Sequence, residues 1–454
     1  MSACAMPASP ARIARVVLEP DAGSWGVMMH EHLARRGALD AGARAFREQL
    51  GLPTDRPVIM SGHQAELWHP GILTKFLAAN ALAERTGAAI AWLVVDQDAN
   101  DPFGLAAPAR ADRAPFRTET WRMGPDAMGK PAMSLPAATP TGAPEFETAV
   151  DLGDRFERVR AALRARTDAP NAAVQLTEAV FDLLEGVVDR PQVVYASQIA
   201  ETDLFARTIE RMSDDAEPMR TRYNNATSDH PDAGVRPLGQ SGAHGAELPV
   251  WRLDDSGRRL PVHAGELNDH PTLVPRGMLA TGLARAAGCD LFVHGTGGGA
   301  YEPINDAWIP RLMDGGVLAP FVTATADAHL LLSGELVSRQ DAQRARWEAH
   351  HARHHPGMLD DPDAQRTRNA LVDRIRSAPV NSEERAELFR DLHAVLDEAR
   401  SQHAAALDAL DRHADELTAR TDRSMVSQDR AWSVALHDLA TLAALRERVE
   451  SCFA

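Results

Sequence analysis

Short apolar runs that end abruptly in polar residues recur along the first two thirds of the chain, and most lead into a helical pattern. They begin at Val58, Ile90, Pro191 and Asp290. Runs of this length without alternation are typical of strands buried on both faces of a parallel sheet. Strands that alternate with helices indicate an α/β fold, and we expect its Rossmann-like parallel-sheet core over residues 55–322.

Three further segments flank or interrupt this core. Residues 1–54 carry a helical pattern over 24–50, which predicts an N-terminal helical segment. Residues 102–150 and 221–272 are rich in Pro and Gly, so we expect two insertions there, the second with short strands.

The C-terminal part of the chain is helical in pattern. Its spacing is close to a heptad seam through Leu388, Leu392, Val395, Ala399, His403, Ala406, Leu410, His413 and Leu417. Together with an earlier helical segment, the seam predicts a coiled-coil hairpin over 323–427, and 428–454 is expected to form a helix that packs on the core. The seam must be buried, so we expect a homodimer through the hairpin that loosens when its two histidines are protonated.

The composition of the chain argues against some classes of binding partner. The chain of 454 residues has a net charge of −16, which argues against nucleic acid or an anionic membrane as the main partner. Cys4, Cys289 and Cys452 show neither metal nor disulfide spacing, so we expect a reduced, cytoplasmic protein. We expect neither a signal peptide nor a membrane span, because no apolar stretch is long enough.

The turn after the first strand carries the first candidate site. Gly62 allows close approach to a ligand, and Gln64 follows it. His63 and His69 are suited to bind phosphate oxygens, and Lys75 to neutralise them near the start of a helix. The alternative is that the two histidines only cap the helix and satisfy backbone groups.

Asp96 and Asp98 follow the second strand. If the strand persists, alternation places both carboxylates on the same side, where they are suited to a magnesium ion, a ribose hydroxyl or a substrate amine. The alternative is that one of them caps the following turn.

We expect a glycine-rich ligand-binding loop after the strand that ends at His294. Backbone amides of Gly295, Gly297 and Gly298 are suited to cradle an anion, and the polar run after them includes Glu302. The alternative is a mobile surface loop. The histidine cluster at 350–355 lies on a polar helix without a carboxylate or Cys partner at ligand spacing, so we do not expect a metal there.

Taken together, these segments resemble the BshC family, the cysteine-adding enzymes of bacillithiol synthesis. The family segment G-Q-Q-A-G-L-x-x-G-P is similar to GHQAELWHPG at 62–71, and a strand with tryptophan and acidic residues is similar to AWLVVDQDAND at 91–101. The stretch at 275–303 and QDRAWS at 428–433 resemble later family motifs in the same order. Here His63 replaces the first Gln of the family's pair, and the acidic motif lacks the family's histidine.

The resemblance implies a fold and an activity. The fold is a Rossmann-like core related to adenylyl-transferring ligases, with inserted segments and a coiled coil that dimerises. The activity is an ATP-dependent ligase, with ATP or ADP and Mg²⁺, that joins an amino acid such as cysteine to a sugar-like acceptor. Arg276 would then join the glycine-rich turn in closing the site. Two alternatives stay open: a metal-dependent hydrolase with His63, His69, Asp96, Asp98 and His294 as ligands, and a non-catalytic dimer that binds a nucleotide or a sugar.

Overall fold

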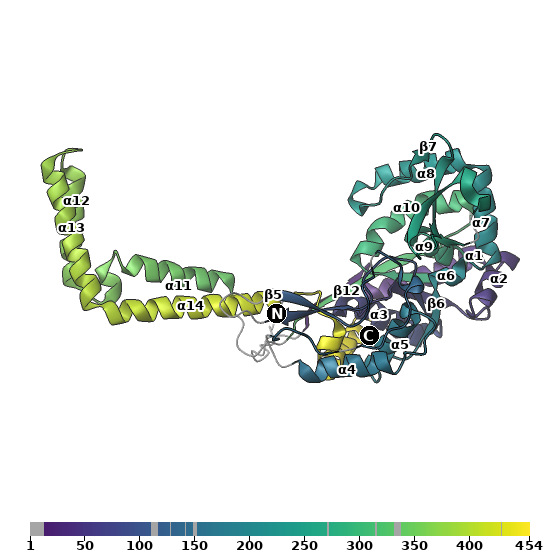
Figure 1. Cartoon of the computed structure of the whole chain (residues 1–454), viewed down its shortest axis with the longest axis horizontal. Coiled ribbons are helices and arrows are strands. Elements are labelled where there is room, and N and C mark those ends of the chain that lie inside the picture. Colours follow the sequence, from purple (N-terminus) through teal and green to yellow (C-terminus); the bar gives the residue numbers. More distant parts are fainter. Residues whose placement is uncertain are drawn as a thin grey trace. The chain divides into compact units, whose positions relative to one another are not determined.

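The computed structural model describes residues 13–109, 117–127, 129–140, 142–148, 152–269, 272–313, 316–330, 337–427 and 429–454. Cys4 and Gln428 lie outside the described residues. The chain divides into two compact units (Figure 1). We call them the core unit, with residues 11–109, 118–331 and 429–454, and the arm unit, which includes 332–428.

The centre of the core unit is a six-stranded sheet in the order β1-β12-β11-β2-β3-β6. The strands are β1 (Ile13–Glu19), β2 (Val58–Gln64), β3 (Ala89–Val95), β6 (Gln192–Tyr195), β11 (Leu291–His294) and β12 (Phe321–Ala328). All neighbouring pairs are parallel except β1 with β12. The predicted α/β fold with a mostly parallel sheet is therefore confirmed.

Two of these strands were not predicted. β1 lies in the segment expected to be helical, and β12 begins at Phe321, where the core was expected to end. β12 has alternating burial and many Ala and Thr residues, so it lacks the continuous run of large apolar residues seen in β2. Its pairing with β1 is antiparallel and joins residues about three hundred positions apart, which no local pattern reveals.

Helix α3 (Pro70–Thr86) connects β2 to β3 and is buried along most of its length. His69 is its N-cap, Pro70 occupies the first turn, and Gly87 ends it in the left-handed conformation at φ 69°. The helix packs against β2, β11 and β12 of the sheet and against α15 (Leu439–Ser451). This packing fixes the first turn of α3 beside the ends of the strands.

The described part of the core unit has nine further helices, none of them longer than α3. They are α1 (Trp25–Arg36), α2 (Ala41–Gln49), α4 (Gly153–Arg164), α5 (Ala172–Leu183), α6 (Ala196–Ile199), α7 (Asp203–Asp214), α8 (Ala216–Asp229), α9 (Gly277–Leu283) and α10 (Thr296–Leu312). The single helix expected over 24–50 is two helices, because Gly37 turns the chain at φ 70° and Asp40 caps the second one. No helix in the described ranges is long and apolar enough to cross a membrane.

Both expected insertions contain strands. The first includes β4 (Gly104–Ala109) and β5 (Arg117–Arg122), which pair with each other. The second begins within α8 and forms a small antiparallel sheet of β7 (Gln240–Ser241), β8 (Gly245–Leu253), β9 (Arg259–His263) and β10 (Leu273–Pro275). We refer to these four strands as the small sheet.

The arm unit contains two packed helix pairs. Its helices are α11 (Arg339–Ala352), α12 (Pro362–Ser377), α13 (Glu383–Gln402) and α14 (Ala404–Ser427). α12 packs on α13 around Leu371 and Leu388, and α11 packs on α14 around Ala349 and Ala414. Most of the apolar seam is thus covered by helices of the same chain, whereas its members Ala406 and His413 are exposed.

The seam is also interrupted, because α13 ends and α14 begins at His403. The imidazole Nε2 of His403 lies 3.2 Å from Oδ2 of Asp361. His403 therefore contacts a carboxylate at the point where the seam is interrupted, and the expected homodimer that loosens in acid stays a prediction.

Candidate functional site

A cavity of about 1150 Å³ opens at the carboxyl ends of β2, β3 and β11, where ligands commonly bind in α/β sheets. Its charged and titratable lining residues come from the core unit: His63, His69, Lys75, Asp98, Arg236, Glu247, His263, Arg276, His294 and Arg430, with Tyr223 and Tyr301. Basic groups outnumber carboxylates among these residues, although the whole chain carries a net charge of −16. The cavity is therefore suited to an anionic ligand.

His69 stands at the start of α3. Its Nδ1 accepts a hydrogen bond from the backbone N–H of Gly71 at 3.1 Å, so Nε2 carries the proton of the neutral ring. Burial, with His63 and Arg430 nearby, lowers the pKa of His69 to about 4. His69 therefore caps α3, as the alternative interpretation expected. Its ring still lines the cavity, where it offers an N–H donor.

Lys75 lines the same cavity from the second turn of α3 and is 5% exposed. Its Nζ donates to the carbonyl oxygen of Gly62 at 2.5 Å and lies 5.5 Å from the centre of the Trp92 ring. Burial lowers the pKa of Lys75 to about 7, although Glu66 acts in the opposite direction. At neutral pH the amine therefore exists in both charged and neutral forms.

Lysine is rare in this chain, which makes its presence in the cavity notable. Lys75 and Lys130 are its two lysines among 48 basic residues, so arginine supplies nearly all the cations. An arginine keeps its proton in any protein environment, whereas a buried lysine can release it. Position 75 thus holds the one basic side chain of the described cavity lining, histidines aside, that can change its charge near neutral pH.

Two further polar contacts fix the end of β2. Nε2 of His63 lies 2.7 Å from Oε1 of Glu66, which follows in the turn. Nε2 of Gln64 donates to Oδ2 of Asp98 at 3.1 Å, and Nη1 of Arg259 donates to Oδ1 of Asp98 at 2.5 Å. Asp98 is therefore held between the main sheet and the small sheet, with both oxygens bonded.

Asp96 is separated from Asp98. β3 ends at Val95, so the alternation that would have put both carboxylates on one side stops before either of them. The carboxylate of Asp96 accepts from the backbone N–H of Ser197 at 2.9 Å and from its hydroxyl at 2.5 Å, at the start of α6. Burial raises the pKa of Asp96 to about 6. The residue does not line the cavity, and its expected role at the site is replaced by one in helix capping.

The glycine-rich stretch is the first turn of a helix, which corrects the expectation of a loop. Gly295 is the N-cap of α10, and Gly297 and Gly298 lie in its first turn and line the cavity. A Cβ on Gly298 would lie 2.2 Å from Nδ1 of His294, so only glycine fits. The first turns of α3 and α10 thus both line the cavity, and helix N-termini favour anions.

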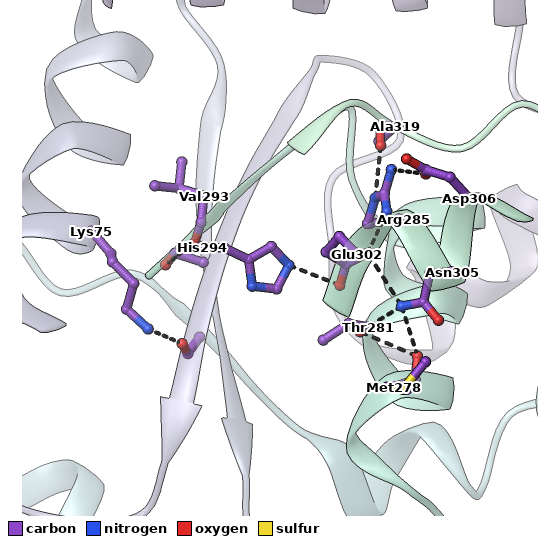
Figure 2. A network of polar contacts seen from close by, with 12 residues as sticks. Lys75, Met278, Thr281, Arg285, Val293, His294, Glu302, Asn305, Asp306 and Ala319 are labelled. Atoms are coloured by element: carbon purple, nitrogen blue, oxygen red, sulfur yellow. Dashed lines mark hydrogen bonds and ion pairs between the residues drawn. The ribbon is translucent and has the colours of Figure 1, made fainter. Parts of the chain in front are cut away.

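Behind this turn lies a buried ionic network (Figure 2). Nε2 of His294 lies 2.9 Å from Oε1 of Glu302, and the other carboxylate oxygen of Glu302 binds Arg285. Nη2 of Arg285 also lies 2.6 Å from Asp306. Burial alone would raise the pKa of Glu302, but His294 and Arg285 hold it at about 2. Glu302 was expected to bind the ligand; it lies outside the cavity lining and instead supports His294.

Trp251 of β8 and Arg276, which follows β10 as the N-cap of α9, also line the cavity. The guanidinium of Arg276 lies 3.7 Å from the centre of the Trp251 ring. Nη2 of Arg276 donates to Oε1 of Glu247 at 2.6 Å, and Nε donates to the carbonyl oxygen of Val250 at 3.2 Å. The ring and these two acceptors fix the guanidinium beside the cavity.

Several residues of the site were missed by the sequence analysis. They are Glu66, Tyr223, Arg236, Trp251, His263 and Arg430. The pair of His63 and Glu66 has a detectable signal, namely a His and a carboxylate three positions apart in a turn. Arg430 lies in the QDRAWS segment that carried the family resemblance, and its Nη2 donates to Oγ1 of Thr325 at 2.7 Å. The small-sheet residues have no such local signal.

Within the part of the chain that the structure describes, no group of three or more His, Cys, Asp or Glu side chains is placed to hold a metal ion. His63 faces Glu66, Asp96 faces Ser197, and Asp98 faces Arg259, so these side chains do not converge. The histidines at 350–355 lie close together along α11 and its end, with the rings of His351 and His355 stacked at 6.1 Å between their centres.

Comparisons of the sequence with known proteins give no family assignment. No protein-family model matches the chain, and no curated protein matches it.

Proposed function

We propose that this protein is an ATP-dependent ligase or nucleotidyl-transfer enzyme that joins an amino acid, such as cysteine, to a small sugar-like acceptor, in the manner of the BshC family. The observation that carries the proposal is the basic cavity at the ends of parallel strands in an otherwise acidic protein. The proposed core is Rossmann-like and the proposed arm is a dimerising coiled coil.

The strand-end side of the cavity is suited to the phosphates of the nucleotide. Two helix N-termini, those of α3 and α10, supply backbone N–H groups and favourable dipoles. His69 offers a neutral N–H donor, and Lys75 and Arg430 offer positive charge. Donors fixed in this way stabilise charge that develops on a transferring phosphoryl or adenylyl group without reorganisation.

The small-sheet side is suited to the amino acid and the acceptor. Arg276 is held by Trp251 and Glu247. Within the described residues its Nη1 atom forms no hydrogen bond, so it remains for a substrate carboxylate. Glu247 and Asp98 are the carboxylates of the described lining, and both are already bonded to arginines. A Mg²⁺ ion that accompanies the nucleotide would be held mainly by its phosphates.

No observation favours either alternative function, the metal-dependent hydrolase or the non-catalytic binding protein. The proposed ligands of a metal-dependent hydrolase face different partners, as described above. A non-catalytic binding protein would have no need for a lysine whose pKa lies near 7 in its ligand cavity.

Isothermal titration calorimetry with ATP and ADP tests the proposal. We expect the wild type to bind both, and Lys75→Met to bind them more weakly. Lys130→Met is the matched control, since it removes the other lysine of the chain, which lies outside the cavity lining. A wild type that binds neither nucleotide at millimolar concentration would remove the ligase proposal.

A further inference from the structure

His63 and Glu66 form a pair at the edge of the cavity. Nε2 of His63 lies 2.7 Å from Oε1 of Glu66, and the side chains are 23% and 35% exposed. His63 is the last residue but one of β2, and Glu66 follows in the turn that leads to α3. Both come from a strand end and a short turn, so their relative position is set by rigid backbone.

The pairing fixes the state of the imidazole. A carboxylate only accepts hydrogen bonds, so Nε2 carries the ring proton and Nδ1 keeps its lone pair. No hydrogen bond to Nδ1 of His63 is formed by any described residue. His63 lines the cavity, so the ring presents a proton acceptor to a bound molecule.

Charges around His63 keep this acceptor available. Burial and the nearby Lys75 lower its pKa, against the opposing effects of Glu66 and Asp98, so the ring is neutral at neutral pH. His69, from the turn before α3, also faces it. A base has to be neutral before it can take a proton.

We propose that His63 is the general base of the ligation step and that Glu66 is the residue that positions it and stabilises its protonated form. This inference rests on the proposed function and assigns a role in it to a pair of residues. The arrangement is that of a carboxylate–imidazole pair, in which the carboxylate fixes the tautomer and stabilises the imidazolium.

The ligation step forms one C–N bond and moves one proton from the acceptor to His63. The acceptor's amine loses a proton to Nδ1 of His63 while its nitrogen lone pair attacks the carbonyl carbon of an amino acid whose carboxyl group ATP has activated. A C–N bond forms, and the C–O bond to the phosphate leaving group breaks with its electron pair. The imidazolium, stabilised by Glu66, then releases the proton to solvent or to the leaving phosphate.

Two other groups in the cavity could in principle act as the base. Nζ of Lys75 is directed to the carbonyl of Gly62 and is 5% exposed, whereas His63 has a free acceptor atom. His263 of the small sheet also has a glutamate three positions on, with Nδ1 3.1 Å from Oε2 of Glu266. The pair at 63 and 66 is favoured because it stands at the strand ends, beside the first turn of α3.

The two residues also depart together from the family pattern. In G-Q-Q-A-G-L the positions of His63 and Glu66 hold Gln and Gly, and here the segment reads GHQAEL. Neither Gln nor Gly could form a carboxylate–imidazole pair. The two substitutions together create it, which makes it a property of this chain.

The first test needs no substrate. In protein labelled with ¹⁵N-histidine, NMR reports which ring nitrogen of His63 carries the proton, and His63→Ala identifies the signal. We expect the proton on Nε2 alone in the wild type and a mixture of tautomers in Glu66→Ala. The signal of His30, an exposed residue of α1 bonded to its own helix, serves as reference. A proton on Nδ1 in the wild type, or an unchanged tautomer in Glu66→Ala, would overturn the pairing.

The second test separates base catalysis from folding. The wild type is incubated with ATP, cysteine and either glucosamine or hydroxylamine, whose nitrogen attacks without prior deprotonation. We expect His63→Ala and Glu66→Ala to lose roughly a hundredfold or more in transfer to glucosamine and to retain hydroxamate formation. Glu84→Gln, which removes one charge from α3 outside the cavity lining, is the control and should behave as the wild type.

The outcomes are distinct. Equal loss with both nucleophiles, or loss in Glu266→Gln in place of Glu66→Ala, would overturn the role of His63 as base. A wild type that forms no hydroxamate with any amino acid would remove the ligase proposal, and the tautomer measurement would still decide whether the pair exists.

Discussion

Nζ of Lys75 lies 2.5 Å from the carbonyl oxygen of Gly62, and within the described part of the chain this is the one hydrogen bond of that side chain. A carbonyl oxygen accepts from an ammonium and, more weakly, from an amine, so the contact can hold the nitrogen in place in either protonation state. The absence of a bonded carboxylate is why burial can lower the pKa of Lys75 to about 7.

We expect Lys75 to react with a small amine reagent at neutral pH. In competitive labelling with acetic anhydride, followed by mass spectrometry, its reactivity should rise with pH through a midpoint at about 7. Lys130, the other lysine of the chain, is measured in the same digest for comparison. A midpoint for Lys75 close to the ordinary lysine value of 10.5 would contradict the prediction.

We expect Lys75→Met to stabilise the fold at neutral pH. A lysine with a lowered folded-state pKa binds its proton more tightly when unfolded, so its cost to stability is full below about 7 and declines as the pH rises towards 10.5. Removing that cost should raise the free energy of unfolding by on the order of 1–3 kcal/mol. Urea unfolding measures it, and a gain that did not shrink at alkaline pH would argue against this cause.

We expect Glu302→Gln to destabilise the core unit by about 3 kcal/mol, because it leaves the buried Arg285 with less negative charge beside it. The matched control is Asp363→Asn on α12, whose partner Arg366 is exposed, and exposed ion pairs contribute little. Urea unfolding of both variants gives the comparison. Equal effects of the two variants would show that the buried network does not support the fold.

Glu302 should also make the free energy of unfolding depend on pH in the acid range. The pKa of Glu302 is about 2 in the folded protein against an ordinary value of 4.5. Its contribution to stability is therefore complete above 4.5 and is lost as the pH falls towards 2. The difference in unfolding free energy between the wild type and Glu302→Gln should narrow over this range, and a constant difference would contradict it.

We propose that the arm unit forms a homodimer through the faces that its helix pairs leave uncovered. Trp347 on α11 is 53% exposed and Phe389 on α13 is 41% exposed, while most of the seam residues are already packed within the chain. We expect the double variant Trp347→Glu and Phe389→Glu to be a monomer by light scattering at micromolar concentration. A wild type that is itself a monomer would refute the dimer.

The sequence was sufficient to predict the parallel strands β2, β3, β6 and β11, but not β1 and β12 at one edge of the sheet. Val58, Ile90 and Asp290 begin short apolar runs of strands that are mostly buried. Such a run is visible in the local sequence, whatever the strand pairs with. β1 and β12 depend on pairing between distant segments, and the alternating burial of β12 resembles that of an ordinary surface strand.

For the site, too, residues with a local sequence signal were predicted, and residues placed by contacts between distant segments were not. His63 and His294 lie at strand ends, His69 and Lys75 follow one of them, and the structure brings all four into one cavity. Asp96 lies one residue beyond the end of β3, where the direction of a side chain depends on how the chain turns, and Ser197 of a distant helix binds it. Arg276 and Trp251 meet through strand pairing in the small sheet, which composition alone does not indicate.

The interruption at His403 has a mechanical consequence for the arm unit. α12 with α13 and α11 with α14 form two separately packed pairs, and a single residue joins α13 to α14. A continuous helix resists bending along its whole length, whereas a joint of one residue concentrates compliance at one point. The contact between His403 and Asp361 ties this joint to the residue that caps α12, so it restrains bending at that point.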